Sequence, residues 1–415
     1  MLHAFVRRNV QEIRDDPALR IHGALLGVTH LLTLLFWLIR RPLDEILLAR
    51  VPICWPFWES CHEHRVLDAR GVLALECVYF FVSFVSIVLF AQKRTVHAAW
   101  WVLLATNALK LAIVVQDYQL RLNQHYMAGL ATLVFLFFPG KRDLCRLAVV
   151  GFYFAAGLVK LDHEWLSGAA LVGELWLFRG AALPWACAYV VVLELAIVWG
   201  LLARHRWVFW PALAQIVVFQ LFSWPIVGFF YPTLMYCLLA LFVLVRFVPA
   251  PGASAATDPA PHPVVALARR RAPRSTYAYV VGFALLQVVP LLFPGDSALT
   301  GEGRMFAIHM FDALAVCKAY AMVHLPGRER RPVRVLGREV ARIRCDPIVV
   351  WNRAKALCRT RHRGARPFED LDLYLDARRR SERAFSRIIA YRSFCTRTPS
   401  YDLWRHNAWI LPTGS

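Results

Sequence analysis

Apolar residues gather in long runs over the first 295 positions of the chain. A helix needs about 17–25 consecutive apolar residues to cross the hydrocarbon core of a bilayer. On this criterion we predict about nine transmembrane helices, the fourth and fifth of them short, at 22–39, 71–91, 96–116, 126–139, 146–161, 183–203, 207–223, 226–247 and 276–294. The pattern therefore predicts a polytopic helical membrane protein.

The polar stretches divide the chain into five parts. We predict an N-terminal cytoplasmic amphipathic segment, a transmembrane core, a Pro/Ala-rich cytoplasmic linker, a last transmembrane helix and a basic extramembrane domain, at residues 1–21, 22–248, 249–275, 276–295 and 296–415. The expected fold class is an all-α polytopic membrane protein with a small α+β extramembrane C-terminal domain.

Three segments of this C-terminal domain carry a local pattern. Residues 332–340 alternate around a glycine, as a short hairpin does. Residues 347–357 and 371–389 are predicted to form amphipathic helices.

Composition agrees with a membrane protein, because 58% of the residues are hydrophobic and the mean hydropathy is +0.46. The formal net charge of +20 is a property shared with nucleic-acid-binding proteins. In a membrane protein, however, basic loops first report orientation and attraction to anionic lipid. We find neither an aromatic-and-basic nucleic-acid module nor a zinc-ligand spacing, so we expect the lipid bilayer as partner, and no nucleic acid and no metal.

Basic residues lie before the first predicted span and after the second, fourth, sixth and eighth. With nine spans all these loops fall on one side, which the positive-inside tendency makes cytoplasmic. Five arginines between residues 40 and 70 depart from this pattern. Residues 1–20 lack the features of a cleaved signal peptide, so the first span is expected to remain as an anchor. We expect a bacterial inner (cell) membrane location, with the N-terminus cytoplasmic and the C-terminal domain outside.

The predicted orientation decides which of the ten cysteines can form disulfides. Cys54 and Cys61 lie in a predicted outer loop, where an oxidising environment allows a disulfide. The alternative is two unpaired thiols packed against the neighbouring aromatic residues. Cys77, Cys187 and Cys237 fall in predicted spans, where they are expected to act as small apolar residues.

Lys160 ends a segment that is otherwise apolar enough to cross a membrane. Tyr153 lies about two helical turns before it, so both side chains share a helix face with Gly157 between them. A buried lysine can act as a base, whereas one near a helix end can also extend its ammonium to the headgroups. His125 opens the fourth span, and the loop count places it on the same outer side as Lys160. We predict an outward-open pocket shared by Lys160, Tyr153 and His125.

Several motifs follow one another in a characteristic order, at 123–126 (Asn-Gln-His-Tyr), 153–168 (Tyr-Phe-Ala-Ala-Gly-Leu-Val-Lys-Leu-Asp-His-Glu-Trp-Leu-Ser-Gly), 175–178 (Leu-Trp-Leu-Phe) and 220–223 (Gln-Leu-Phe-Ser). In these motifs the chain resembles the core of vitamin K-dependent γ-glutamyl carboxylase, and equally the wider group of horizontally transferred transmembrane (HTTM) domain proteins. Looser similarity at 303–312 and 381–388 extends the resemblance over nearly the whole chain.

The resemblance implies that Lys160 is the base that deprotonates a reduced vitamin K or menaquinone-type hydroquinone, with Tyr153 beside it. Oxygen then reacts, the γ-proton of a glutamate is removed and CO₂ is captured, so O₂ and CO₂ are the implied co-substrates. Implied partners are a lipid-soluble quinone and an exported peptide or protein. The site must exclude water, because water would quench so strong a base.

The remaining implied site residues depart from the family pattern. The pocket Asn-His pair falls on Gln124 and His125, which leaves Asn123 as the candidate for the missing asparagine. Gln215 replaces a second pocket histidine, and His309 falls on the acidic position of a Trp-Asp pair. Within its 415 residues the chain also lacks the β-rich lumenal extension of the carboxylase. The alternative function is a non-carboxylase HTTM protein that binds a lipid or quinone, or assists maturation or immunity of an exported peptide.

Overall fold

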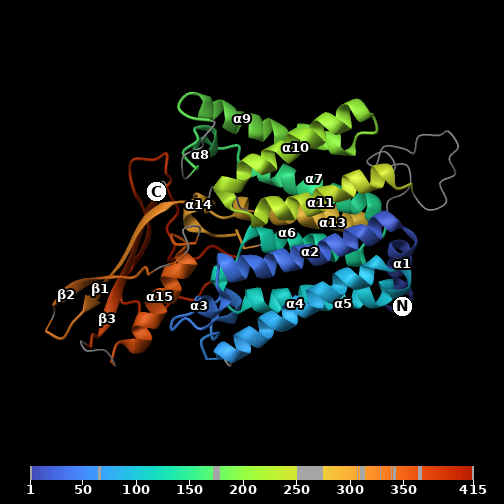
Figure 1. Ribbon diagram of the computed structural model, residues 1–415. Coiled ribbons are helices and arrows are strands. Elements are labelled where there is room, and N and C mark those ends of the chain that lie inside the picture. The colour runs from blue at the N-terminus through green and yellow to red at the C-terminus, as the bar shows by residue number, and fades with distance from the viewer. Residues whose placement is uncertain are drawn as a thin grey trace.

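A computed structural model describes residues 2–63, 67–171, 178–249, 274–305, 307–308, 314–327, 329–337, 339, 343–362 and 367–413. Long helices lie side by side in an elongated bundle, and a small β-sheet is attached at one end (Figure 1). The bundle contains α2 (Pro17–Ile39), α4 (Ala69–Ala91), α5 (Val96–Val115), α6 (Asn123–Phe137), α7 (Lys141–Val159), α9 (Ala182–Leu195), α10 (Arg206–Val227), α11 (Phe230–Phe247) and α13 (Arg274–Val288).

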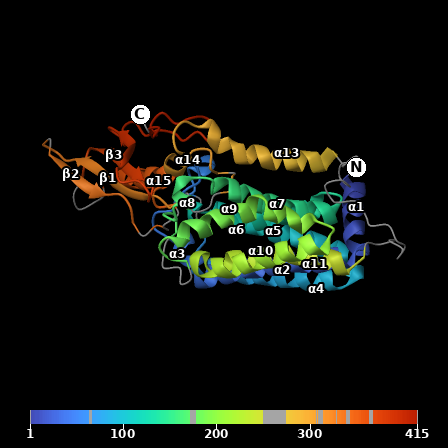
Figure 2. The ribbon, with the colours of Figure 1, turned by 90° about the horizontal axis from the view of Figure 1, so that it is seen from above.

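The nine predicted spans all coincide with helices of this bundle, but the number nine is not confirmed. Within the described chain six helical segments are long and apolar enough to cross a membrane, at Pro17–Ile39, Ala69–Ala91, Lys93–Val115, Ala182–Leu202, Arg206–Val227 and Phe230–Phe247. The other three are α6 and α13, with 15 residues each, and α7, which begins with the charged residues Lys141, Arg142 and Asp143. Figure 2 shows α13 running alongside the bundle on one side.

Short elements connect and close the bundle. They are α3 (Leu43–Leu47), η1 (Pro56–Trp58), η2 (Lys93–Thr95), η3 (Tyr118–Leu120), α8 (His163–Leu166), η4 (Ile197–Leu202), η5 (Val289–Leu292) and α14 (Ser297–Thr300). The amphipathic helix α1 (Leu2–Asp15) crosses the end of the bundle away from the sheet (Figures 1 and 2). Lys141 holds it there, because its Nζ donates to Asn9 Oδ1 at 2.6 Å and to the Phe138 carbonyl at 2.8 Å. We call this the α1 end, and the opposite one the sheet end.

The C-terminal domain at the sheet end contains four antiparallel strands and α15 (Pro347–Thr360). The strands are β1 (Val316–His324), β2 (Arg330–Arg334), β3 (Asp370–Arg378) and β4 (Ser386–Tyr391), in the order β2-β1-β3-β4. The predicted α+β character is confirmed, and so is a helix over 347–357. The hairpin predicted at 332–340 is displaced, since β2 pairs with the preceding strand β1.

The predicted amphipathic helix at 371–389 is wrong, because this segment forms β3 and β4. Leu371, Leu373, Leu375 and Ala377 are all fully buried and recur every second residue. That spacing puts them on one face of a strand, whereas a helix would spread them around its axis. The period of two in the sequence is therefore the pattern that indicates a strand here.

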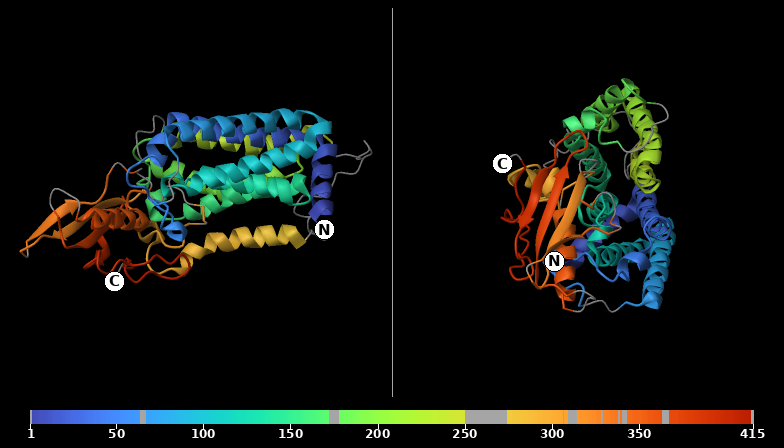
Figure 3. Two further views of the ribbon diagram at one scale, coloured as in Figure 1. Left: turned by 90° about the horizontal axis from the view of Figure 1, so that it is seen from below. Right: turned by 90° about the vertical axis from the view of Figure 1, so that its left-hand side faces the viewer.

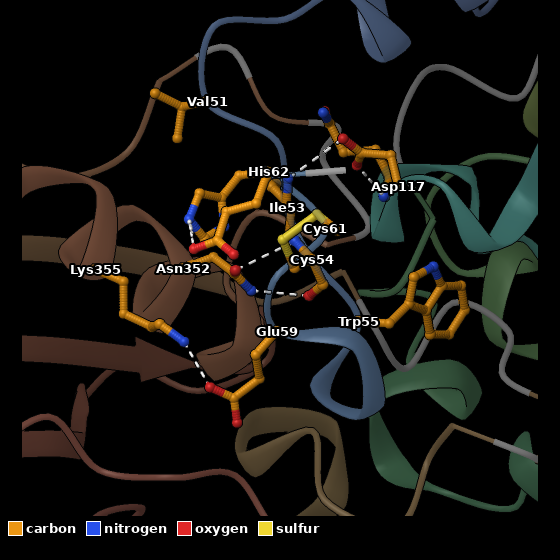
Figure 4. The surroundings of a disulfide bond; sticks show 12 residues. Val51, Ile53, Cys54, Trp55, Glu59, Cys61, His62, Asp117, Asn352 and Lys355 are labelled. Atoms are coloured by element: carbon orange, nitrogen blue, oxygen red, sulfur yellow. Dashed lines mark hydrogen bonds and ion pairs between the residues drawn. A yellow bond between two sulfur atoms is a disulfide. The ribbon is translucent and has the colours of Figure 1, made fainter. Parts of the chain in front are cut away.

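The C-terminal domain and the bundle share a hydrophobic core. Buried residues of the sheet and α15 belong to the same cluster as Trp37 of α2, Tyr79 of α4 and Tyr118 of η3. Asn352 on α15 adds polar contacts, with its amide donating to the Cys54 carbonyl at 3.0 Å and its Oδ1 accepting from the Cys54 amide at 3.2 Å (Figure 4). The domain is therefore packed on the bundle as an integral part of the fold.

All disulfides of the described chain lie at the sheet end. The predicted Cys54–Cys61 bond is confirmed (Figure 4), and two further bonds, Cys317–Cys345 and Cys358–Cys395, join parts of the C-terminal domain. The free cysteines are Cys77, Cys145, Cys187 and Cys237, all within bundle helices.

Candidate functional site

A cavity of about 690 Å³ lies between α9, α10 and the segment that follows α7. Figure 3 shows this edge of the bundle, where the green and yellow-green helices α9 and α10 stand away from the sheet. Apolar and aromatic side chains form nearly all of the wall, with Lys160, Gln215 and Ser223 as the polar exceptions of note. An apolar cavity with few polar groups is the usual form of a small-molecule site.

Lys160 lies at this cavity and is 2% exposed. Its Nζ contacts both carboxylate oxygens of Glu194 at 2.5 Å, and Glu194 is fully buried. The interpretation of Lys160 as an interfacial lysine that reaches the headgroups is therefore wrong, since its ammonium points into the protein. Inside a bundle such a pair persists because each charge compensates the other.

Close helix packing brings these two residues together. Lys160 caps the C-terminus of α7, and Glu194 lies near the end of α9. A Cβ atom added to Gly157 would lie 2.9 Å from Leu195 Cδ2 and 3.0 Å from Glu194 Cβ. A glycine is required at this position, because any side chain would push α9 away and separate the ion pair.

Aromatic rings surround the ammonium on its other sides. The Nζ of Lys160 lies 4.9 Å from the Trp165 ring centroid and 5.6 Å from that of Phe219. Trp165 is itself oriented by a hydrogen bond from its Nε1 to the Cys187 carbonyl on α9, at 3.0 Å. Cation–π contacts of this kind stabilise a cation that has lost its hydration.

Tyr153 lies one layer behind the cavity wall. Its hydroxyl accepts a hydrogen bond from Gln220 Nε2 at 2.8 Å, and Ser223, which lines the cavity, donates to the Gln220 carbonyl at 2.8 Å. Gln215 reaches the cavity directly, and its Oε1 accepts from the Tyr189 hydroxyl at 2.6 Å. Tyr153 is thus linked to the cavity through Gln220 and Ser223.

The C-terminal domain is fastened to the segment just after Lys160. Both carboxylate oxygens of Glu164 accept backbone hydrogen bonds from the β3–β4 connection, from Arg380 at 2.9 Å and from Ser381 at 2.8 Å. Arg379 bridges Asp162 and Asp296. Burial raises the pKa of Asp296, but the hydrogen bonds and charge of Arg379 outweigh this, so the pKa lies below its ordinary value. We call these contacts the loop clamp.

His125 lies elsewhere, so the predicted pocket shared by Lys160, Tyr153 and His125 is not found. The His125 ring packs among Trp37 and Phe230, with centroids 5.4 and 5.5 Å away. Phe230 contacts His125, whereas its neighbour Tyr231 lines the cavity, so the first turn of α11 lies between the two sites. The loop count placed both residues at the same end correctly, but it carried no information on which helices lie between them.

The other predicted site residues are distributed as follows. Asn123 and Gln124 begin α6 next to His125, and neither lines the cavity. Gln215 does line it. His309 lies outside the described residues.

Sequence reasoning missed Glu194, the partner of Lys160. A signal for it was present, because Glu194 is an acidic residue inside an apolar span, and such residues face the interior of a bundle. Its assignment to Lys160 needed the packing of α9 on α7. The loop-clamp residues Glu164 and Arg379 were missed because their partners, Arg380 and Asp162, lie 216 and 217 positions away in the sequence.

Comparison of the chain with protein-family models, curated proteins and solved structures finds no significant match. The resemblance to the carboxylase and HTTM proteins accordingly rests on the sequence motifs around Lys160.

Proposed function

We propose that the chain is an integral membrane enzyme, similar to vitamin K-dependent γ-glutamyl carboxylase, that binds a lipid-soluble hydroquinone in the cavity and uses Lys160 as its base. The observation that carries this proposal is a buried lysine at the wall of a large apolar cavity within a membrane bundle. The motif around Lys160 supplies the second support, because it is the one in which the carboxylase base occurs.

The residues of the cavity fit a reduced quinone. Its apolar and aromatic walls suit a ring and an isoprenoid chain, while Lys160 and Gln215 offer polar contacts for ring oxygens. Such a hydroquinone supplies an acidic hydroxyl and, with oxygen, the reactivity that the resemblance ascribes to the carboxylase. Lys160 is the charged group of the lining, so it would orient the ring with an oxygen toward its ammonium.

Glu194 makes base chemistry possible for a buried lysine. A proton that moves from Lys160 Nζ to a Glu194 oxygen converts the ion pair into a neutral amine and a carboxylic acid. The amine then accepts a proton from the ligand hydroxyl. The resulting ammonium balances the charge of the deprotonated ligand, so the site as a whole stays neutral throughout. Exclusion of water by the aromatic wall keeps these proton positions defined.

We further propose that α6, α7 and α13 also cross the membrane, with the sheet end outside and the α1 end in the cytoplasm. Figures 1 and 2 show these three helices running in the same direction as the six apolar segments. The disulfides of the described chain lie at the sheet end, as an oxidising side requires. Lys93, Arg94 and Arg142 lie at the α1 end, as the positive-inside tendency favours.

The test measures quinone binding and turnover separately in lipid nanodiscs. A short-chain menaquinone serves as the probe, with binding read from quenching of tryptophan fluorescence and turnover from oxygen-dependent loss of its reduced form. The informative variant is Lys160→Met combined with Glu194→Leu, because it removes both charges together and leaves no unpaired one. Lys93→Met, at an exposed lysine of the α1 end, is the matched control.

Binding in all three proteins, with turnover in wild type and Lys93→Met only, is the expected result. Lys160→Arg should also lack turnover, because a guanidinium stays protonated. Absence of quinone binding to the wild type would refute the proposal. Equal turnover in the double variant would remove Lys160 from the chemistry.

A second candidate is a non-catalytic HTTM protein that binds a quinone or lipid, or assists maturation or immunity of an exported peptide. The tight pairing of Lys160 with Glu194 favours it, because a closed ion pair also serves to hold α7 and α9 together. Binding without turnover in the wild type would select this candidate.

A further inference from the structure

The cavity beside Lys160 has a mouth on the outer surface of the bundle, between α9 and α10. Three residues of its lining are exposed, and all three lie on these two helices. They are Trp185 (79%) and Tyr189 (47%) on α9 and Val218 (48%) on α10. Lys160 lines the same cavity and is buried. The cavity therefore leads from an exposed rim to a buried ammonium.

This mouth lies at a depth where the bundle meets the hydrocarbon of the bilayer. Both helices belong to segments that are long and apolar enough to cross a membrane. Tyr189 lies seven residues after the start of α9, about 10 Å along the helix axis. Val218 lies nine residues before the end of α10, about 13–14 Å along its axis. At such depths an exposed side chain of a spanning helix contacts lipid.

The rim has the chemistry of a lipid-facing surface. Lys160 is the only charged residue among the described residues of the lining, and it is buried. Charged side chains are costly on a surface that faces hydrocarbon, so an uncharged rim is what such a position requires. A ligand that reaches this mouth must already be dissolved in the bilayer.

The volume of the cavity limits how much of a ligand it can enclose. A volume of about 690 Å³ corresponds to roughly 20 non-hydrogen atoms, at the roughly 30 Å³ that a water molecule occupies in the liquid. A bicyclic quinone ring and about two isoprene units fill this space. The rest of a longer chain must leave the cavity through the mouth and lie in the surrounding lipid.

One hydrogen bond joins α9 to α10 at the cavity. The Tyr189 hydroxyl on α9 donates to Gln215 Oε1 on α10 at 2.6 Å. Gln215 is held in place by its own helix, because its Nε2 donates to the Pro211 carbonyl at 2.9 Å. Tyr189 and Gln215 both line the cavity, so α9 and α10 can separate here only when this bond breaks.

We propose that the cavity takes up its ligand sideways from the bilayer, and that the Tyr189–Gln215 hydrogen bond is the latch across its mouth. This mode of entry rests on the proposed function and specifies the ligand as an amphiphile with a ring-sized polar head and one long apolar chain. The head enters first and stops at Lys160. The chain extends between α9 and α10 into the lipid.

The test compares two menaquinones, with one and with four isoprene units, as ligands of the full-length protein in lipid nanodiscs. Association and dissociation rates are measured by stopped-flow quenching of tryptophan fluorescence. The wild type should bind both menaquinones, because a chain that leaves through the mouth meets no end wall. Rejection of the longer one would show a closed pocket and overturn the proposal.

A bulky side chain at Ala214 should block the mouth, because Ala214 is exposed on α10 and lines the cavity. Ala214→Phe should slow the association of both menaquinones by about tenfold. Val217→Phe is the matched control, since Val217 is exposed on the same helix and is not among the described residues of the lining. An association rate in Ala214→Phe equal to that of the wild type would overturn the proposal.

Tyr189→Phe removes the latch and keeps the ring. Association and dissociation should both become faster by about threefold to tenfold, as the loss of one hydrogen bond predicts. Tyr236→Phe is the matched control, because the Tyr236 hydroxyl donates to the Val217 carbonyl at 3.1 Å and so joins α11 to α10 away from the described lining. Unchanged rates in Tyr189→Phe would rule out the latch.

The same measurements separate this proposal from the proposed function. If the wild type binds neither menaquinone, the proposed function is refuted and the sideways entry with it. If the wild type binds both at rates that Ala214→Phe and Tyr189→Phe leave unchanged, only the sideways entry is refuted.

Discussion

Two buried lysines of one bundle meet the same electrostatic problem in different surroundings. Lys160 is compensated by Glu194 at 2.5 Å, whereas Lys110 has no protein counter-charge within the described chain. A charge in a low-dielectric interior needs an opposite charge or must lose its proton. Substituting Lys160 and substituting Lys110 should therefore affect the stability of the protein differently.

Replacing Lys160 alone should destabilise the protein, because it leaves the fully buried Glu194 unpaired. We expect Lys160→Met to cost about 3–5 kcal/mol, and Glu194→Leu to cost a similar amount for the reverse reason. The double variant should recover most of this loss, since two apolar side chains replace a complete pair. Thermal unfolding of the four proteins in a double-mutant cycle checks this. Additive losses would show that the two charges do not interact.

Among the secondary-structure elements, the β3–β4 connection and α8 matter most for the site. The loop clamp holds α8 through Glu164, and α8 carries Trp165, whose ring faces the Lys160 ammonium. The C-terminal domain thus positions one wall of the cavity. Asp296, bridged to the same loop by Arg379, makes this attachment dependent on pH.

Asp296→Asn should remove a pH-dependent part of the stability. The pKa of Asp296 is lowered in the folded protein, so its contribution is present above the ordinary value of 3.8 and is lost as the pH falls through the lower folded value. We expect the variant to be less stable near neutral pH by about 1.5–3 kcal/mol, with the difference vanishing in acid. Unfolding of both proteins between about pH 7 and 3 measures this. Asp376→Asn, on the partly exposed pair with Arg387, provides the baseline.

The loop that carries Cys54 and Cys61 is fastened to α15 through Asn352 (Figure 4). Replacing both cysteines by serine should cost about 2–3 kcal/mol, because the bond closes only a short loop. Cys77→Ser, at a free thiol of α4, should change stability little. Mass spectrometry after alkylation without reduction tests the bond itself, and finding both thiols alkylated would contradict it.

For the whole molecule, the disulfides at the sheet end and the short basic loops at the α1 end predict the orientation. Alkaline phosphatase fused to the C-terminus should be active, because the sheet end is expected outside the cytoplasm. A cytoplasmic reporter fused at the same point should give no signal, and the opposite pattern would invert the proposed topology. A phosphatase fusion after Lys93 should be inactive, since η2 lies at the α1 end.

Much of this protein follows from its sequence alone. Long apolar runs predict the bundle helices, because hydrophobicity and helix length are local properties. The same holds for the Cys54–Cys61 bond, whose partners are seven positions apart, and for α15. The alternation over Leu371, Leu373 and Leu375 is equally local. It is the period of a strand, whereas the sequence analysis predicts a helix there.

Only the tertiary structure decided which charged groups meet. Lys160 contacts Glu194 because α9 packs on α7 at Gly157. His125 is separated from the cavity because the first turn of α11 lies between them. Glu164 contacts the Arg380 backbone, and Asp162 contacts Arg379, because the fold brings the β3–β4 connection to α8. Each of these contacts joins residues distant in the chain, and the energy that selects them comes from the burial of whole helix and sheet faces. No local pattern contains that information, because it exists only once the faces are packed.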